Sequence, residues 1–487
     1  MNKEETMITD HLYPQRVFYY FEQIAAIPHG SRNTKAISDY LVEFAKEHQL
    51  VWYQDESNNV VIVKEATQGY ESAEPIIIQG HMDMVCEKEK GVNIDFEKDG
   101  LKLYVDGDFS KAEGTTLGGD DGIAVAYALA LLESSEIAHP KLEVVITVDE
   151  EIGMLGADAI DLSMLTGHTM LNIDSDVEGS FLTGCAGGNA VNVTLPVKRV
   201  AQHGQKLSLT VTGLEGGHSG SEIDKEHGNA NILMGRLLRN LFDETPFGII
   251  TLAGGLKDNA IPRECVAEIL LPEENVNLAK EIVNNLNNEF KKEFSVSDPD
   301  VGVEVCDLGA SEADILDFGS VSRVIFYLRS VPNGVQNMSQ VNRGLVETSL
   351  NLGIMELRED VLYTVTSIRS SVGTRKADLL DRVTAIVELL GGEAEVEGDY
   401  PAWEYKQDSL LRPQIAKVYE KLYGKEPVFE TIHAGLECGL LSEKIKNLDC
   451  VSFGPDNFDI HTPKERLSIS STGRVWDFIV EFLKQAK

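Results

Sequence analysis

Apolar residues near the start of the chain recur at intervals of three and four, the spacing of one face of an α-helix. The pattern falls on Ile37, Leu41 and Phe44, and a similar one covers 17–27. Short runs rich in Val and Ile then predict buried strands, separated by a strongly apolar helical segment at 121–133. The strands are predicted at 59–64, 75–79, 141–148 and 168–173. This alternation predicts an α/β fold with a mixed, mostly parallel sheet flanked by helices.

The pattern changes near Gly188 and changes back near Gly398. Alternating apolar and polar residues predict strands at 190–197 and 206–212, and helical spacing follows at 229–241. We therefore predict a large α+β domain inserted into the α/β domain. The predicted boundaries are 1–187 for the first part of the α/β domain, 188–398 for the insertion and 399–487 for the second part.

Charge and composition narrow the classes of partner and compartment. The chain carries 43 basic and 79 acidic side chains, a formal charge of −36, which repels nucleic acid and anionic membranes, so we expect neither as a partner. The longest apolar run, 124–132, is far shorter than the roughly 20 residues of a membrane span. The six cysteines show no paired spacing, and 1–15 lacks the features of a signal peptide. We predict a cytoplasmic protein.

Histidine and carboxylate side chains follow several of the predicted strands. His81 and Asp83 come directly after one strand, two residues apart, so an extended chain places both on one face. Because the carboxyl ends of parallel strands meet at one edge of a sheet, four segments deliver their polar residues to the same place. These residues are His81, Asp83, Asp120, Glu150, Glu151 and Asp174. Such a set fits a two-metal hydrolytic site, although helix capping or a solvated acidic loop would explain single members.

The loop 114–122 is rich in glycine and leads into the predicted helix at 121–133. Glycine-rich loops at helix starts can cradle phosphate through their backbone amides, so nucleotide binding is an alternative. The lysine of a phosphate-binding loop is missing, however, and Asp120 and Asp121 stand where the anion would lie. The loop therefore suits a cation better than a nucleotide.

Together these motifs are similar to those of the di-zinc dipeptidase, aminoacylase and carboxypeptidase family, over essentially the whole chain. They are Gly80-His81-Met82-Asp83, Gly119-Asp120-Asp121-Gly122, Asp149-Glu150-Glu151-Ile152-Gly153, Asp174, Gly216-Gly217-His218-Ser219-Gly220 and His461. Within the family the chain most resembles the bacterial aminoacyl-histidine dipeptidases. The segments that carry this second resemblance are 258–263 and 433–439.

The resemblance implies a set of metal ligands and catalytic residues. One zinc ion would be held by His81 and Asp174, and the other by Glu151 and His461, with Asp120 bridging the two. Each zinc would then have three protein ligands and an open position, as catalytic zinc does. Mn²⁺ or Co²⁺ are possible substitutes in such a site. The remaining implied roles are Asp83 to orient His81, Glu150 as the general base that activates water, and a cis peptide bond between Asp120 and Asp121.

Substrate contacts are also implied by the resemblance. Asn259 and Arg369 would bind the carboxylate of a dipeptide, and His218 would stabilise the oxyanion in its own chain or in a partner's. Glu437 would hold the free amino group. The inserted domain would act as a lid or dimerisation domain of the catalytic α/β domain, and we expect a homodimer.

The leading hypothesis is a cytosolic di-zinc dipeptidase that cleaves unblocked dipeptides, with Xaa-His among its substrates. An N-acyl amino-acid deacylase, or an exopeptidase for longer peptides, would use the same metal residues. A protein that only binds metal or peptide is a third hypothesis. It is disfavoured because a purely structural metal site has no need of Glu150 beside its ligands.

Overall fold

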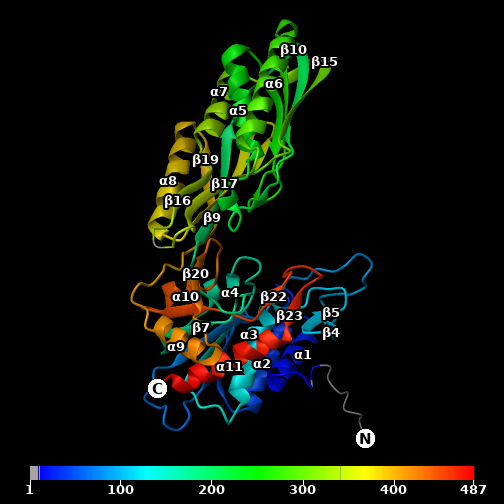
Figure 1. The fold of residues 1–487 in the computed structure, drawn as a ribbon. Coiled ribbons are helices and arrows are strands. Elements are labelled where there is room, and N and C mark those ends of the chain that lie inside the picture. Colours follow the sequence, from blue (N-terminus) through cyan, green and yellow to red (C-terminus); the bar gives the residue numbers. More distant parts are fainter. Residues whose placement is uncertain (1–8, 10, 341) are drawn as a thin grey trace. The chain divides into compact units, whose positions relative to one another are not determined.

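The computed structural model describes residues 9, 11–340 and 342–487. Within these residues the chain forms two compact units (Figure 1). The first unit extends to Gly184 and resumes at Tyr405–Thr431 and Leu436–Lys487. The second comprises Cys185–Glu404 and the short segment Ile432–Gly435.

The segment Ile432–Gly435 differs from the sequence-based division, which places it with 399–487. It lies with the second unit because the Ala186 amide donates hydrogen bonds to the carbonyls of Ile432 and Ala434. A segment of four residues is too short to show a hydrophobic pattern that would assign it to either unit. The roles of the two units as catalytic and lid or dimerisation domains stay predictions.

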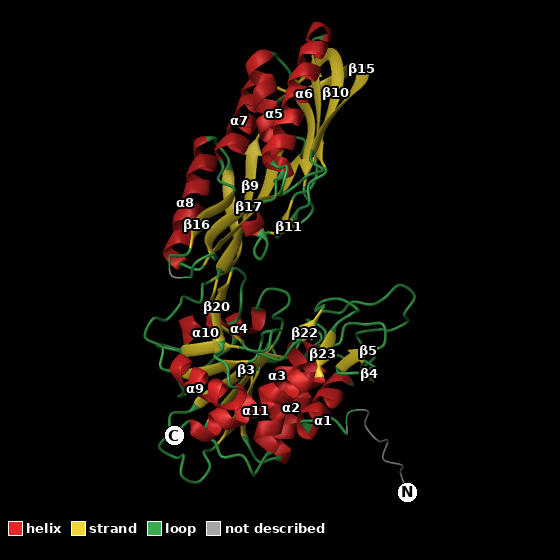
Figure 2. Cartoon of the chain, in the orientation of Figure 1, coloured by secondary structure: helices red, strands yellow, loops and turns green. Residues whose placement is uncertain are grey.

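The first unit is built on an eight-stranded sheet with the order β1-β2-β6-β3-β7-β21-β8-β20 among the described residues (Figure 2). Its strands are β1 (Val51–Gln54), β2 (Val60–Lys64), β3 (Ile76–His81), β6 (Leu142–Thr147), β7 (Thr169–Asn172), β8 (Ser180–Cys185), β20 (Val428–Ile432) and β21 (Asp449–Ser452). β6, β3, β7 and β21 are parallel to one another, whereas β1, β2 and β8 pair antiparallel. The predicted mixed α/β class is confirmed, with the parallel part confined to the centre of the sheet.

Helices pack against this sheet, and the first unit also contains a small second sheet. The helices are α1 (Gln15–Ala25), α2 (Lys35–Glu47), α3 (Gly119–Glu133), α4 (Leu155–Ala159), α9 (Leu411–Tyr423), α10 (Cys438–Lys444) and α11 (Ile469–Gln485). The small sheet consists of β4 (Leu103–Asp106), β5 (Phe109–Ala112), β22 (Asn457–Phe458) and β23 (Arg466–Ser468). The predicted apolar helix is α3. It is buried on all sides from Ile123 to Leu132, because it packs on β3 and is covered by α1, and Tyr127 stacks on Trp476 of α11.

The second unit is an antiparallel sheet with helices packed along it (Figure 2). Its strands are β9 (Gly187–Pro196), β10 (Arg199–Thr212), β12 (Gly248–Gly254), β14 (Cys265–Leu271), β15 (Gly302–Leu316), β16 (Gly334–Met338), β17 (Val346–Leu357), β18 (Val361–Ser370) and β19 (Glu393–Tyr400). The helices are α5 (Ala230–Glu244), α6 (Val276–Glu293), α7 (Phe318–Ser330) and α8 (Gly373–Leu389). A separate ribbon pairs β11 (Gly217–His218) with β13 (Ala260–Ile261), and short 3₁₀ turns lie at Ile223–Lys225 and Glu273–Asn275. No helix in the described part of the chain is long and apolar enough to cross a membrane.

Candidate metal centre

The ends of the parallel strands bring the predicted ligands together. β3 lies between β6 and β7, and all six of its residues are buried, as expected for a central strand. In the parallel register His81 pairs with Thr147, and Gln79 pairs with Asn172. The residues that follow each strand therefore leave the sheet at one edge. This edge carries His81, Asp83, Glu150, Glu151 and Asp174.

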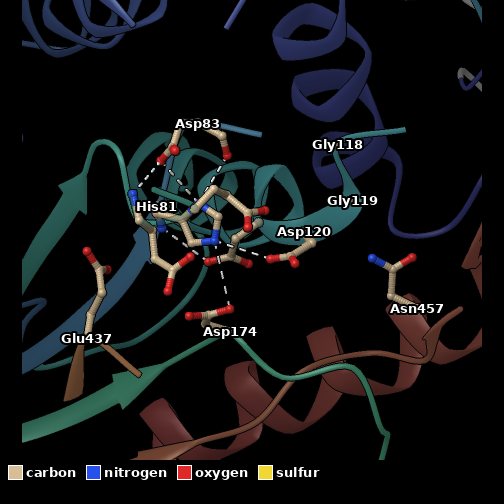
Figure 3. A network of polar contacts seen from close by, with 12 residues as sticks. His81, Asp83, Gly118, Gly119, Asp120, Asp174, Glu437 and Asn457 are labelled. Atoms are coloured by element: carbon tan, nitrogen blue, oxygen red, sulfur yellow. Dashed lines mark hydrogen bonds and ion pairs between the residues drawn. The ribbon is translucent and has the colours of Figure 1, made fainter. Parts of the chain in front are cut away.

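His81 is fully buried and contacts three carboxylate-bearing residues (Figure 3). Its Nε2 atom lies 3.2 Å from Oδ1 of Asp120 and 3.9 Å from Oδ1 of Asp174. Its Nδ1 atom lies 3.0 Å from the carbonyl oxygen of Asp83 and 3.4 Å from Oδ1 of the same residue. One ring nitrogen thus faces Asp83 and the other is directed at two carboxylates, which is the arrangement of a metal-ligating imidazole with an orienting acid.

Asp120 faces a second imidazole with its other oxygen. Oδ2 of Asp120 lies 3.2 Å from Nε2 of His461, and the same nitrogen lies 3.0 Å from Oε2 of Glu151. The side chain of His461 is 46% exposed, against 1% for His81. The two oxygens of one carboxylate therefore point to two imidazole-carboxylate groups, one deep and one near the surface.

Burial makes this group of acids costly without a cation. Burial raises the pKa of Asp174 to about 7, and burial together with neighbouring acids raises that of Glu150 well above its usual range. Among the described residues, Oε1 of Glu151 and Oδ2 of Asp174 are buried without a hydrogen-bond partner. Ligand atoms of the set lie within 4.8 Å of one another in three overlapping groups. They are His81 with Asp121 and Asp174, His81 with Glu150 and Glu151, and Asp120 with Glu151 and His461. Nitrogen and carboxylate donors at this spacing fit divalent cations.

Asp83 links the deep imidazole to the strand end that carries Glu150. It accepts hydrogen bonds from Oγ of Ser31 at 2.8 Å and from the backbone amide of Glu150 at 3.1 Å. Its side chain is fully buried, so it has little freedom to turn away from His81. The contact fits the predicted orienting role.

Comparison with known proteins bears directly on this arrangement. The profile of the peptidase family M20/M25/M40 matches residues 77–485. The chain is also 36% identical to the cytosol non-specific dipeptidase of Escherichia coli K12 over 476 residues, which cover 97% of this chain and 98% of the relative. The chain belongs to the peptidase family M20/M25/M40. The predicted family and enzyme class are thereby confirmed.

Two solved structures resemble this peptidase in fold over almost its whole length. The aminoacylhistidine dipeptidase of Vibrio alginolyticus superimposes with a TM-score of 0.92 at 36% identity, over all of this chain and 99% of the other. The aminopeptidase PepT of Bacillus cereus, at 15% identity and a TM-score of 0.57 over 98% and 99% of the two chains, shows the fold alone. The whole length of this peptidase, with its second unit, thus has a structural counterpart.

The irregular first turn of α3 holds one feature that the resemblance implies and one acid that the sequence-based ligand set does not include. The peptide bond between Asp120 and Asp121 is cis, as implied. Asp121 is buried, and its Oδ2 accepts a hydrogen bond from the His81 amide at 3.2 Å. Its proximity to His81 and Asp174 makes it a further candidate ligand. The sequence showed two adjacent aspartates, but only the fold shows that both face the same site.

Two further acids of the first unit lie near these ligands. Burial and the charge of Asp120 raise the pKa of Asp176 to about 8. Glu437 is fully buried, and its Oε2 accepts hydrogen bonds of 2.6 Å from Nε2 of Gln79 and from Oγ1 of Thr147, behind the ends of β3 and β6. Its other oxygen, Oε1, has no hydrogen-bond partner in the described chain. Glu437 therefore belongs to the edge that carries the candidate ligands.

The other predicted substrate residues lie in the second unit. His218, in β11, is next to the segment of Asn259, because the Ser219 amide donates to the Asn259 carbonyl at 2.8 Å. The side chain of Asn259 is exposed. Nη1 of Arg369 donates to the Tyr400 hydroxyl at 3.1 Å, and its Nε is buried without a partner among the residues described.

His433 joins this cluster, although its position in the sequence gave no assignment. Its Nε2 lies 2.7 Å from Oγ of Ser349. Burial, together with the positive charges of Arg369 and His218, lowers the pKa of His433 to about 4. Burial and Arg369 also lower the pKa of His218. His218, Arg369 and His433 form a cluster that favours an anion, here called the basic cluster.

Proposed function

We propose that this peptidase is a two-metal dipeptidase that cleaves unblocked dipeptides, with Xaa-His among its substrates. The observation that carries the proposal is the placement of Asp120 between two imidazole-carboxylate groups, at 3.2 Å from each ring. The names of the relatives from Escherichia coli and Vibrio alginolyticus, a non-specific dipeptidase and an aminoacylhistidine dipeptidase, support the substrate class.

The donor set supports two zinc ions. His81 and Asp174 would hold one ion, Glu151 and His461 the other, and Asp120 would bridge them. Three protein donors per ion leave a position for water or substrate, and the same donors accept Mn²⁺ or Co²⁺. When bound, such ions would supply Lewis acidity at the peptide carbonyl and make a nearby water more acidic at neutral pH.

The chain's own residues would then move the proton. Glu150 offers a carboxylate oxygen within 4.8 Å of ligand atoms of His81 and Glu151, which supports it as the group that would accept a proton from an attacking water. The same group would return the proton to the leaving amine. Asp83 would hold His81 in one orientation through Nδ1 throughout the reaction.

Recognition of the two ends of a dipeptide would involve oppositely charged residues. Arg369 suits the substrate carboxylate, since a guanidinium binds carboxylates with two parallel hydrogen bonds, and Asn259 would assist it. His218 would donate to the oxyanion. Oε1 of Glu437, which has no partner in the described chain, is the group available for a free amino terminus.

Cellular setting and assembly are part of the proposal. The Escherichia coli relative is named a cytosol enzyme, and we propose the cytoplasm for this peptidase as well. We propose that the second unit acts as a lid and a dimerisation domain, and that the enzyme works as a homodimer. A deacylase of the same family is the second candidate, because the metal-binding residues by themselves do not distinguish peptide from N-acyl substrates.

The decisive experiment measures hydrolysis of β-alanyl-histidine, alanyl-histidine and an N-acetylated amino acid. The purified enzyme is assayed before and after chelation, after zinc restoration, and as the Glu150→Ala variant with its metal content determined. We expect chelator-sensitive cleavage of the free dipeptides only, lost in the variant although its metal is retained. Cleavage of the acetylated compound alone would favour the deacylase. No cleavage by a protein that retains two metals would favour a binding protein.

A further inference from the structure

The glycine-rich loop that leads into α3 does bind an anion through its backbone amides. The anion is the side-chain carboxylate of Glu465 in the same chain. Oε2 of Glu465 accepts hydrogen bonds from the amides of Leu117 and Gly118 at 2.7 and 3.2 Å. Oε1 accepts from the amides of Gly119 and Asp120 at 2.8 and 3.3 Å. Glu465 is only 4% exposed. Four consecutive amides, ending at the bridging aspartate, therefore share one buried carboxylate.

The physical reason for this contact lies in the irregular backbone where the loop enters α3. Gly118 has a left-handed φ of 68°, and Asp120 and Asp121 have non-helical backbone angles. Buried backbone amides outside regular secondary structure need a hydrogen-bond acceptor. Glu465 supplies this acceptor for four of them. Its carboxylate fixes the turn from which Asp120 projects.

Glu465 also belongs to the segment that carries the second imidazole. It follows His461 by four residues, and its own amide donates to the Thr462 carbonyl at 3.1 Å. Asn457, at the start of the same segment, lies against the turn as well (Figure 3). A Cβ atom at Gly119 would lie 2.9 Å from Nδ2 of Asn457 and 3.1 Å from Oε1 of Glu465, so a larger residue there would have to displace the ends of these two side chains.

We propose that Glu465 is a positioning residue of the metal centre, which holds the bridging carboxylate of Asp120 at a fixed distance from His461. The inference rests on the proposed two-metal function. The simpler explanation is that Glu465 only joins two distant segments of the chain and stabilises the fold. The two explanations predict different effects of a Glu465 substitution on metal binding. The Glu465 carboxylate accepts a hydrogen bond from the backbone of Asp120, and Glu465 lies four residues after His461. A positioning role therefore predicts weaker metal binding, whereas a purely structural role does not.

The substitution that separates them is Glu465→Gln. A glutamine keeps the size of the side chain, but its amide nitrogen would face backbone donors where a carboxylate oxygen now accepts. The turn must then shift, and Asp120 with it. We expect metal affinity to fall by about 10- to 100-fold, the usual effect of removing an outer hydrogen-bond partner of a metal site. The visible spectrum of the Co²⁺-loaded protein should change, because it reports the geometry around the ion. Glu465→Asp, which keeps the charge, should recover part of the affinity.

Glu143 provides a matched control in the same unit. It is a buried glutamate whose carboxylate accepts hydrogen bonds from the amides of Thr166 and Gly167 and from Nζ of Lys141. It lies near the start of β6, whereas the sheet edge that carries the candidate ligands His81, Asp83, Glu150, Glu151 and Asp174, here called the metal edge, is at the end of that strand. Glu143→Gln should lower thermal stability as Glu465→Gln does, without changing metal affinity or the Co²⁺ spectrum.

The experiment titrates apo enzyme with Co²⁺ against a chelator of known affinity for wild type, Glu465→Gln, Glu465→Asp and Glu143→Gln. Melting temperature and dipeptide hydrolysis are measured on the same samples. Weaker Co²⁺ binding and an altered spectrum in Glu465→Gln alone, with partial recovery in Glu465→Asp, would support the proposal. Equal loss of stability in both glutamine variants, with wild-type affinity and spectrum, would overturn it and leave the dipeptidase function intact. A wild-type protein that binds no metal would overturn both.

Discussion

The metal edge of the first unit and the basic cluster of the second both leave buried polar atoms without a hydrogen-bond partner among the described residues. These atoms are Oδ2 of Asp174 and Oε1 of Glu151 in the first, and Nε of Arg369 in the second. Leaving a polar atom of a charged side chain buried and unpaired is costly, so each arrangement favours a ligand of opposite charge. The carboxylates of the first suit cations, and the guanidinium of the second suits a carboxylate.

The two regions differ in how they are assembled. The metal edge is set by the ends of neighbouring parallel strands, so most of its residues follow short sequence motifs. The basic cluster draws His218, Arg369 and His433 from segments far apart in the sequence, and none of these positions stands at the end of a repeated pattern. This difference suggests that substitutions in the first region should affect metal content and turnover, and those in the second substrate binding and stability.

The largest effect is expected from Asp120→Ala, which removes the carboxylate proposed to bridge the two ions. Because a metal centre contributes several kcal/mol to lowering the barrier, we expect kcat/KM to fall by at least about 10³-fold. Metal stoichiometry should fall from two per chain. Metal analysis and dipeptide kinetics check this, with the exposed Asp158→Ala as the control. Retention of two tightly bound ions in Asp120→Ala would contradict a bridging role.

Arg369→Lys tests the basic cluster without removing its charge. Lysine cannot form two parallel hydrogen bonds to a carboxylate, so we expect KM for alanyl-histidine to rise by about 10- to 100-fold, corresponding to about 1.4 to 3 kcal/mol. Metal content should stay at the wild-type value, unlike in Asp120→Ala. Arg375→Lys is the matched control, because Arg375 forms an ion pair with Glu347 in the same unit. A fall in kcat with unchanged KM would argue against carboxylate binding by Arg369.

The pH dependence of stability should distinguish the basic cluster from the metal edge. His433 has a pKa of about 4 in the folded chain and about 6.5 when unfolded, so below pH 6.5 the unfolded state binds the proton more readily. The contribution of His433, taken as the difference in the free energy of unfolding between wild type and His433→Gln, should therefore fall by about 2 kcal/mol between pH 7 and pH 5 and change little below pH 4. Denaturant titrations of both proteins at both pH values measure this. An equal loss in the variant would show that other groups are responsible.

The smallest expected effect concerns Glu437, the acid at the metal edge assigned to the substrate. Glu437→Gln removes the charge that would hold a free amino group, and we expect kcat/KM for alanyl-histidine to fall about 10-fold, in the range of one lost hydrogen bond to a charged group. The metal content, measured in parallel, should stay at the wild-type value. A loss of metal together with activity would mean that Glu437 acts through its contacts with Gln79 and Thr147 at the metal edge.

Much of the metal edge could be predicted before the fold was known, because its ligands are local in sequence. His81, Glu150 and Asp174 each follow a run of apolar, β-branched residues, and parallel strands end together. The apolar run after Asp121 likewise predicted α3, since a helix that is apolar all round must be buried. The position of Asp121 was not predictable, because it depends on which side chains face the site at an irregular turn. The contact of Glu437 with Thr147 was not predictable either, because the two residues lie 290 positions apart in the sequence.

The sequence by itself determined the α/β class, the family and the residues that gather at the strand ends, since short-range periodicity and motif spacing encode them. Only the tertiary structure decided which way each charged side chain faces and which distant segments complete the site. Glu465 shows the reason most clearly. The glycine-rich loop indicates backbone amides that can bind an anion. Their acceptor, Glu465, lies 346 positions after Gly119, and only folding of the chain brings the two together.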